Sequence, residues 1–389
     1  MRPLHAKLAF VLLAATLGCD DPTGVGVELI DIRSGAPQIE QLSPAFQSNH
    51  VTYDVTGNAR RAMLGSVEDP LAGGTRAAAA LDFAIPSTLI PSADFQQGPV
   101  EYAELQLVPD YIYGDTTSTI DVSVSEIFET WTATGNNSSA SIPSGPQITT
   151  AMLGAADTLL VIPLPESWYK DPVTEANLRS QDFVTLFQGF LVEPLSNGVL
   201  FGIDFDESSM LVVSGGDTLN FLLSRNLSLV SRTSPGSPQP GRVVLQDGHS
   251  SGLGVEFDFD SVDLANVAVS RAVLRVSYDS LAINQQLPPN FVRPALTQVD
   301  FVGITSDSVA VPLATSSVAD GVLLFDGPVL RATLQDALIG QSVFDSFALM
   351  GSIDLQPVQN TANVLILSDG TIDTDGPTMA LTVIKPAEL

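Results

Sequence analysis

The feature that most constrains the fold is a two-residue alternation of apolar and polar side chains along the chain. Residues 103–107 read Ala-Glu-Leu-Gln-Leu, and residues 120–125 read Ile-Asp-Val-Ser-Val-Ser. Successive side chains of a strand point to opposite faces, so the pattern is typical of strands with one face buried and one face in water. Similar runs occur at residues 51–55, 81–85, 159–162, 199–205, 219–223, 243–245, 255–259, 273–276, 299–302, 309–311, 322–325, 364–367 and 379–384. The 26 prolines and 30 glycines of the chain supply turns between them, and we expect an all-β fold built from antiparallel sandwiches.

The same elements recur in the same order in two halves of the chain. Residues 182–197 align with residues 345–360 at a constant offset of 163, and residues 103–107 align with residues 272–276. Upstream, residues 61–64 align with residues 242–245, so the offset drifts as differences in loop length would produce. We therefore expect two related jelly-roll-like antiparallel β-sandwiches in tandem, over residues 36–225 and 226–389. A proline-rich tract at residues 234–241 is typical of a linker or an exposed loop.

One short crossover helix is expected in each sandwich. Pro328 occupies a position typical of a helix start, apolar residues recur every four positions after it, and Gly340 follows as a stop signal. The matching place in the first half is residues 166–181, which Pro172 interrupts.

The start of the chain predicts export. Arg2 and Lys7 precede a largely apolar run at residues 8–17, which is shorter than the roughly 20 residues that span a bilayer. This pattern predicts a cleavable signal peptide over residues 1–18. Gly18 and Cys19, the only cysteine of the chain, resemble the lipobox of bacterial lipoproteins, although Thr16 stands where that family usually has leucine.

The lipobox resemblance implies cleavage before Cys19, acylation of its sulfur and amino group, and a lipidated tether over residues 19–35. The alternative is an ordinary signal peptide that leaves a secreted protein with an unpaired thiol. Two or more acyl chains would anchor the protein stably to a membrane. The lipobox reading places it in the bacterial cell envelope, with the outer membrane as the expected site.

Charge narrows the range of partners. Loss of residues 1–18 removes Arg2 and Lys7 and leaves 14 basic against 44 acidic residues. Phosphate backbones repel such a polyanion, so we expect no nucleic-acid partner. The charged fraction is only 15%, which indicates a surface solvated mainly by neutral polar groups.

Three stretches resemble a large family of uncharacterised bacterial lipoproteins. They are Met63-Leu-Gly-Ser-Val-Glu-Asp-Pro-Leu71, Glu101-Tyr-Ala-Glu-Leu-Gln-Leu107, and Tyr113-Gly-Asp-Thr-Thr117. The family carries a Leu-Gly-x-x-x-Asn/Asp-Pro turn, a Tyr-Tyr-Gly-Asp hairpin and a terminal acyl-cysteine. The layout is also similar to the DNRLRE type of jelly-roll module, some members of which bind carbohydrate. Neither resemblance supplies catalytic residues.

One pentapeptide matches a catalytic pattern by letter. Residues 248–252, with Ser250 at the centre, fit the Gly-x-Ser-x-Gly nucleophile elbow. That elbow needs a helix after the serine and a histidine farther along the chain. Alternation at residues 253–259 predicts a strand instead, and no histidine follows His249. The pattern favours a hairpin loop over a serine hydrolase acting through Ser250.

Metal and glycan sites have weaker signals. The mature chain keeps only His50 and His249, which disfavours zinc. Calcium needs only oxygen ligands, and Asp369, Asp373 and Asp375 lie at suitable spacings beside glycines. They form the calcium candidate, while no other cofactor is expected. Five aromatic residues are candidates for stacking on sugar rings or for packing in the sandwiches: Tyr111, Tyr113, Trp131, Trp168 and Tyr169.

These observations favour a non-enzymatic lipoprotein with an adhesive or scaffolding surface. Its expected partners are the membrane, through Cys19, and a glycan or another envelope protein. A carbohydrate-binding lipoprotein, with or without calcium, is the alternative.

Overall fold

The computed structural model describes residues 36–52, 59–133, 141–233, 240–248, 251–259, 267–284, 287–351, 360–372 and 375–385. Within these residues the chain forms antiparallel sheets of twelve, five, four and two strands, with a few short helices. The prediction of an all-β, sandwich-like fold is confirmed.

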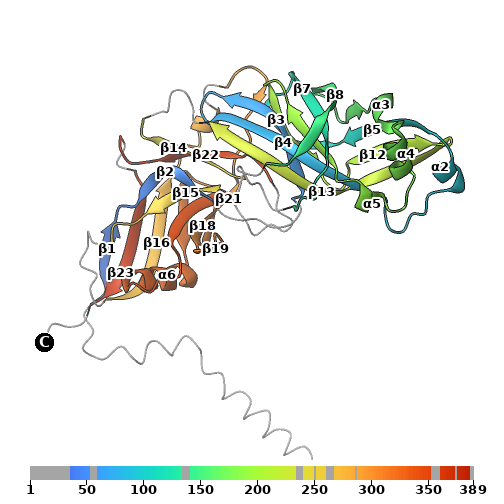
Figure 1. Ribbon diagram of the computed structural model, residues 1–389. Helices are drawn as coiled ribbons and strands as arrows, with labels where there is room; N and C mark the ends of the chain where they lie inside the picture. The colour runs from blue at the N-terminus through green and yellow to red at the C-terminus, as the bar shows by residue number, and fades with distance from the viewer. Residues whose placement is uncertain are drawn as a thin grey trace, which may run out of the picture.

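The N-terminal half is built on the twelve-stranded sheet (Figure 1). Its strands, given in chain order, are β3 (Arg61–Asp69), β4 (Gly73–Ala84), β5 (Val100–Leu107), β6 (Pro109–Asp115), β7 (Thr119–Ile127), β8 (Ser144–Gly154), β9 (Leu160–Pro163), β10 (Phe190–Pro194), β11 (Val199–Asp204), β12 (Ser209–Ser214), β13 (Asp217–Thr233) and β17 (Phe291–Val292). Strand β4 pairs with β3 over its first part and with β10 over its second part, while β13 runs along its other side. The sheet therefore divides at β4, and its branches enclose one core.

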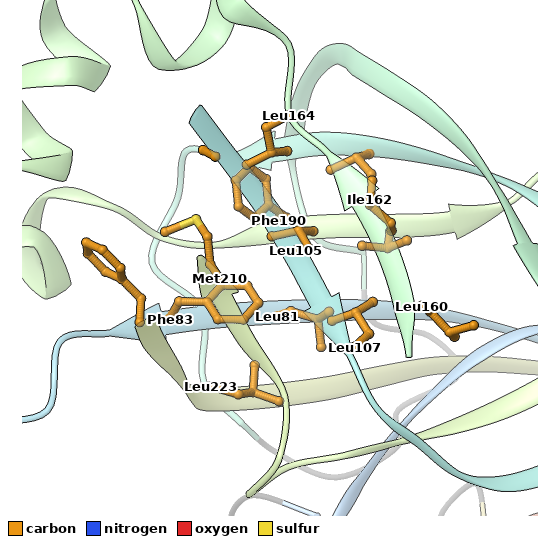
Figure 2. Packing of buried hydrophobic residues seen from close by; sticks show 14 of the residues in the cluster. Leu81, Phe83, Leu105, Leu107, Leu160, Ile162, Leu164, Phe190, Met210 and Leu223 are labelled. Atoms are coloured by element: carbon orange, nitrogen blue, oxygen red, sulfur yellow. The ribbon is translucent and has the colours of Figure 1, made fainter. Parts of the chain in front are cut away.

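That core is filled by alternate residues of the strands. In β5, the side chains of Ala103, Leu105 and Leu107 are fully buried, while Glu104 and Gln106 are half-buried on the other face. Leu105 and Leu107 pack with residues of β4, β9, β10 and β12 (Figure 2). The alternation in the sequence thus corresponds to burial on one face.

Two facing sheets form the C-terminal half. The four-stranded sheet has the order β1 (Gln38–Leu42), β23 (Thr378–Ile384), β16 (Ala268–Ser277), β20 (Val322–Asp326). The five-stranded sheet has the order β19 (Ala310–Ser317), β18 (Gln298–Ile304), β21 (Ser346–Gly351), β15 (Ser251–Glu256), β2 (Ala45–Thr52). Both sheets contribute to one buried cluster, which includes Leu42, Leu274, Phe301, Leu349 and Met379. The remaining pair of strands, β14 (Arg242–Gln246) and β22 (Val364–Ser368), lies between the halves (Figure 1).

Strand pairing differs from the predicted boundaries in two places. Strands β1 and β2, which the boundaries at residues 36–225 assign to the first sandwich, pair with β23 and β15 of the C-terminal half. In Figure 1 these two blue strands lie among yellow, orange and red ones. Strand β13 also continues through residues 225 and 226 without a break. The reason is physical: alternation shows which residues face a core, but it carries no information on which strand lies alongside.

The helices follow the proline signals. Helix α6 (Pro328–Leu338) forms where it was predicted, with Pro328 in its first turn and buried Leu330 and Leu334 facing the core. The predicted helix at residues 166–181 is instead two short ones, α3 (Glu166–Tyr169) and α4 (Pro172–Leu178), and a third, α5 (Phe183–Leu186), follows them. Pro172 begins α4, because its missing N–H is not needed there. The other helical segments named within the described residues are α2 (Ala93–Gln97) and the 3₁₀ turn η3 (Ala282–Asn284).

The repeat alignment at constant offset is wrong over one stretch. It places residues 182–186 opposite residues 345–349, but the former lie in helix α5 and most of the latter in strand β21. Strand β10 has the same pairing pattern as β21, since it lies between β4 and β7 as β21 lies between β15 and β18. The extra helices of the first half account for the shift.

Candidate functional site

The most developed polar cluster of the described residues surrounds Asp69, at the end of β3. Its Oδ1 accepts hydrogen bonds from the backbone N–H groups of Leu71 and Ala72, at 2.7 and 3.0 Å. Arg293, in the segment that leads from β17 to β18 of the C-terminal half, binds the same carboxylate through Nε to Oδ2 and Nη2 to Oδ1, both at 2.6 Å. Both side chains of this ion pair are fully buried. Two segments 224 residues apart in the sequence therefore meet at one carboxylate.

A tyrosine completes the cluster. The hydroxyl of Tyr113 donates to Asp69 Oδ2 at 2.6 Å, and its ring packs edge-on against Phe291 of β17 at 5.9 Å. The neighbouring Gly114 has φ +123°, and a Cβ there would lie 2.5 Å from the carbonyl oxygen of Gly198. Only glycine allows β6 to approach the backbone at Gly198 this closely. Two stretches quoted for the lipoprotein resemblance, one containing Asp69 and one beginning at Tyr113, are thus brought into contact.

The protonation states suit this arrangement. Burial alone would raise the pKa of Asp69, but hydrogen bonds from Arg293, Tyr113 and the backbone of Ala72 and Leu71 hold that pKa below its usual range. Burial and the adjacent Asp69 raise the pKa of Tyr113, so its hydroxyl stays protonated and acts as a donor. Each oxygen of Asp69 already accepts at least two hydrogen bonds. The cluster is built to join two parts of the chain rather than to present a reactive group.

A second buried carboxylate, that of Asp247, also lies where the two halves meet. Asp247, which follows β14, accepts hydrogen bonds from the backbone N–H and side-chain amide of Asn363 and from the hydroxyl of Thr361. Arg232 of β13 donates to the backbone carbonyls of Gln246 and Asp247. Burial raises the pKa of Asp247 to about 6, although the hydrogen bonds from Thr361 and Asn363 oppose this.

Further contacts extend the junction. Asn360 donates from its side-chain amide to the carbonyl of Arg61 at 3.1 Å and to the hydroxyl of Ser228 at 2.8 Å. The hydroxyl of Tyr111 accepts from the backbone N–H of Ala362 at 3.1 Å. Apolar side chains of both halves surround these groups: Met63, Val67, Leu71, Ala77, Leu200 and Val230 from the first, Ala282, Ala362, Val364 and Ile366 from the second. We call this set of contacts the inter-half junction.

The aromatic candidates for glycan stacking are packed into the protein. Trp131 is buried, donates from Nε1 to the carbonyl of Gln188 at 2.7 Å, and stacks under Arg225. Trp168 is buried and donates from Nε1 to Glu126 at 2.9 Å. Tyr169 is also buried, and its hydroxyl donates to the carbonyl of Glu101. Rings in these positions stabilise the core and do not present a free face to a sugar.

The calcium candidate is only partly described. Asp369 Oδ1 accepts from the backbone N–H and the hydroxyl of Thr371, at 2.8 and 2.7 Å, which closes a tight turn. Asp375 is exposed, and Asp373 lies outside the described residues. Among the residues that the structure describes, no group of three or more His, Cys, Asp or Glu side chains is placed to hold a metal ion.

The other predicted sites fall mostly outside the described part of the chain. Cys19, the signal peptide at residues 1–18 and the tether at residues 19–35 all lie outside it, as does Ser250. On either side of Ser250 the structure shows strands β14 and β15, where a nucleophile elbow needs a helix after the serine. No helix of the described residues is long and apolar enough to cross a membrane.

Sequence reasoning did not identify the inter-half junction. Asp69 belongs to a turn pattern in the sequence, while Tyr113 belongs to a hairpin pattern and is a candidate for stacking on a sugar; neither pattern indicates that the two side chains meet. The available signal was Arg293, one of 16 basic residues in an acidic chain, set between Phe291-Val292 and Pro294-Ala-Leu296. A single charge in an apolar stretch indicates a buried partner. Comparison with models of protein families, with curated proteins and with solved structures finds no match.

Proposed function

We propose that the protein is a non-enzymatic lipoprotein of the bacterial cell envelope, held at the outer membrane by acylated Cys19. The observation that carries the proposal is the position of the only cysteine, directly after a basic start, an apolar run and Gly18. Two acyl chains on one residue suffice for stable membrane anchoring.

The part of the protein after the tether, residues 36–389, is called the body here. The way its two halves are joined supports a binding or structural role. Its two halves are joined by the buried Asp69–Arg293 pair, the contacts of Asn360 and a shared apolar cluster. Buried ion pairs with good hydrogen-bond geometry resist separation, because removing either partner leaves an uncompensated charge. A junction of this kind holds the two halves in one orientation relative to each other. A surface fixed in this way suits adhesion or scaffolding.

An envelope protein is the favoured partner class over a glycan. Trp131, Trp168 and Tyr169 are buried, so stacking on sugar rings, the usual basis of glycan recognition, is not available from them. The formal net charge of −28 at neutral pH favours a partner with a basic face.

The test of the anchor is mass spectrometry of the mature N-terminus, with the full-length gene expressed in a bacterial host. We expect a chain that begins at Cys19 and carries acyl groups, and a Cys19→Ser variant that is neither acylated nor recovered with membranes. A Thr16→Leu variant restores the usual lipobox residue and serves as the matched control, with processing at least as complete as in the parent. An unmodified Cys19, or cleavage at another bond, would overturn the proposal.

The test of the partner class uses the soluble body, residues 36–389, as bait. Retention of a basic envelope protein and of no polysaccharide supports the proposed role. Saturable retention on a polysaccharide would replace it with the carbohydrate-binding alternative. Treatment of intact cells with protease then shows on which side of the outer membrane the body lies.

A further inference from the structure

The first two strands of the described chain complete a sheet pair that otherwise belongs to the other end of the sequence. Strand β1 pairs with β23 over Gln38–Leu42, and β2 pairs with β15 over Ala45–Thr52. Between them lie Ser43 and Pro44, where the chain passes from the four-stranded to the five-stranded sheet. Proline lacks a donor for the ladder and interrupts the strand at this point.

Strand β13 makes the same passage in the N-terminal half. Its first part pairs with β12 and its second part with β4, and the register shifts between Leu223 and Arg225. The sheet order β13-β12-β5-β9 therefore parallels the order β1-β23-β16-β20. One strand, β13, does in the first sandwich what β1 and β2 do together in the second.

The registers agree residue by residue. Two rows of directly paired, buried residues cross the corresponding sheets: Phe221, Met210, Leu105 and Ile162 in the first, and Leu42, Met379, Leu274 and Phe325 in the second. The partner sheets agree as well, in rows that run through β13, β4 and β10 and through β2, β15 and β21: Asn226, Leu81 and Phe190 in the first, and Phe46, Val255 and Phe347 in the second.

The strands of one sequence repeat and the strands of one folded sandwich are not the same set. The first sequence repeat comprises strands β1 to β12, and the second comprises strands β13 to β23. Matching residues occur in the same order in both repeats, from Leu42 and Phe221 in their first strands to Met210 and Met379 in their last. Each sequence repeat thus begins with a strand that sits in the sandwich of the other repeat. We propose that the two repeats exchange their first strands, and that the C-terminal sandwich is a strand acceptor closed in cis by residues 38–52.

The acceptor selects its strand by shape and apolar pattern. Leu42 is buried among residues of the C-terminal core, and Phe46 packs against the same core from the next sheet. The backbone of β1 satisfies the edge of β23, and β2 satisfies the edge of β15, which would otherwise be open to pairing with another chain. An ion pair between Glu40 and Lys385, at 3.0 Å, ties the outer edge of β1 to the end of β23.

In the sequence, the closing strand is the first strand of the described chain after the proposed membrane anchor. Only residues 20–37 separate Cys19 from β1. If Cys19 is acylated as proposed above, a force on the tether acts directly on the β1–β23 pairing. The strand exchange itself does not depend on that modification.

The test uses residues 36–389, which lack Cys19, with a protease site placed in residues 53–58. After cleavage and co-refolding with an excess of labelled peptide 36–52, we expect the labelled peptide to bind saturably. Chains left uncut should bind none, because their own strand fills the acceptor. A Leu42→Asp peptide should bind at least roughly 30-fold more weakly, since it buries a charge in place of a leucine. Equal binding of the two peptides, or no binding of either, would overturn the proposal.

A second measurement uses residues 36–389 without the protease site, so the chain is never cut. Ile39 and Thr382 are directly paired in β1 and β23, so an Ile39→Cys/Thr382→Cys variant should form an intramolecular disulfide in monomers. The matched control, Ile39→Cys/Thr378→Cys, is four residues out of register and should not. Disulfide-linked dimers in place of monomers would show that the strand comes from a second copy and would refute closure in cis. This result is independent of whether Cys19 carries lipid.

Discussion

Replacing Arg293 by methionine should lower the free energy of unfolding by about 3–5 kcal/mol, the usual cost of removing one partner of a buried ion pair. The structure supports this size. Asp69 would keep Tyr113 and two backbone donors but lose two guanidinium hydrogen bonds at 2.6 Å, each worth about 1.5–3 kcal/mol when charged groups are involved. Methionine retains part of the apolar contact of the arginine side chain.

Urea unfolding followed by two signals makes the test specific. The only tryptophans, Trp131 and Trp168, both lie in the N-terminal half, so fluorescence reports that half while circular dichroism reports both. We expect the two curves to coincide in the parent protein and to separate in Arg293→Met, because the junction that couples the halves is weakened. The surface pair Arg271–Asp326 provides the control: Arg271→Met should change stability by less than about 1 kcal/mol.

A double variant tests whether the loss of stability comes from the uncompensated charge of Asp69. In Asp69→Asn/Arg293→Met the uncompensated charge is gone, while the side-chain amide oxygen at position 69 can still accept from the backbone of Leu71 and Ala72. At least half of the lost stability should return, and the effects of the two single changes should not add. A loss below about 1 kcal/mol in Arg293→Met, or strict additivity in the double variant, would refute the view that this pair holds the halves together.

Two further predictions follow from the junction. Because the pKa of Asp247 is about 6 in the folded protein and 3.8 is its reference value, its contribution to stability is present below about pH 4 and is lost as the pH rises through about 6, by up to about 3 kcal/mol. Unfolding in urea at pH 4 and pH 7.5 should show most of this decline in the parent and a smaller one in Asp247→Asn; equal declines in the two proteins would contradict it. Gly114→Ala should cost about 2 kcal/mol or more, because its Cβ would meet the carbonyl of Gly198 at positive φ. Gly216→Ala has positive φ but open space around the new Cβ, so thermal unfolding should show a smaller loss, and equal losses would point to backbone strain alone.

Several features of the fold could be predicted from the sequence because they depend on local patterns. Alternation at residues 103–107 and 120–125 corresponds to β5 and β7, and Pro328 with the apolar repeat after it corresponds to α6. Burial on one face and helix initiation are properties of a few neighbouring residues, so they can be read without knowing the rest of the structure. The position of Cys19 is a local signal of the same kind.

Only the tertiary structure decided which strands lie side by side. A period-two pattern is the same for every half-buried strand, so nothing in residues 38–52 indicates pairing with β23 and β15 instead of with the first sandwich. The junction is non-local for the same reason: Asp69 and Arg293 lie 224 residues apart, and each alone is only a charged residue near a proline. Local chemistry determined the strands and is the basis of the proposed export signal. Packing, and the need to pair buried charges and sheet edges, determined how the two halves close on each other.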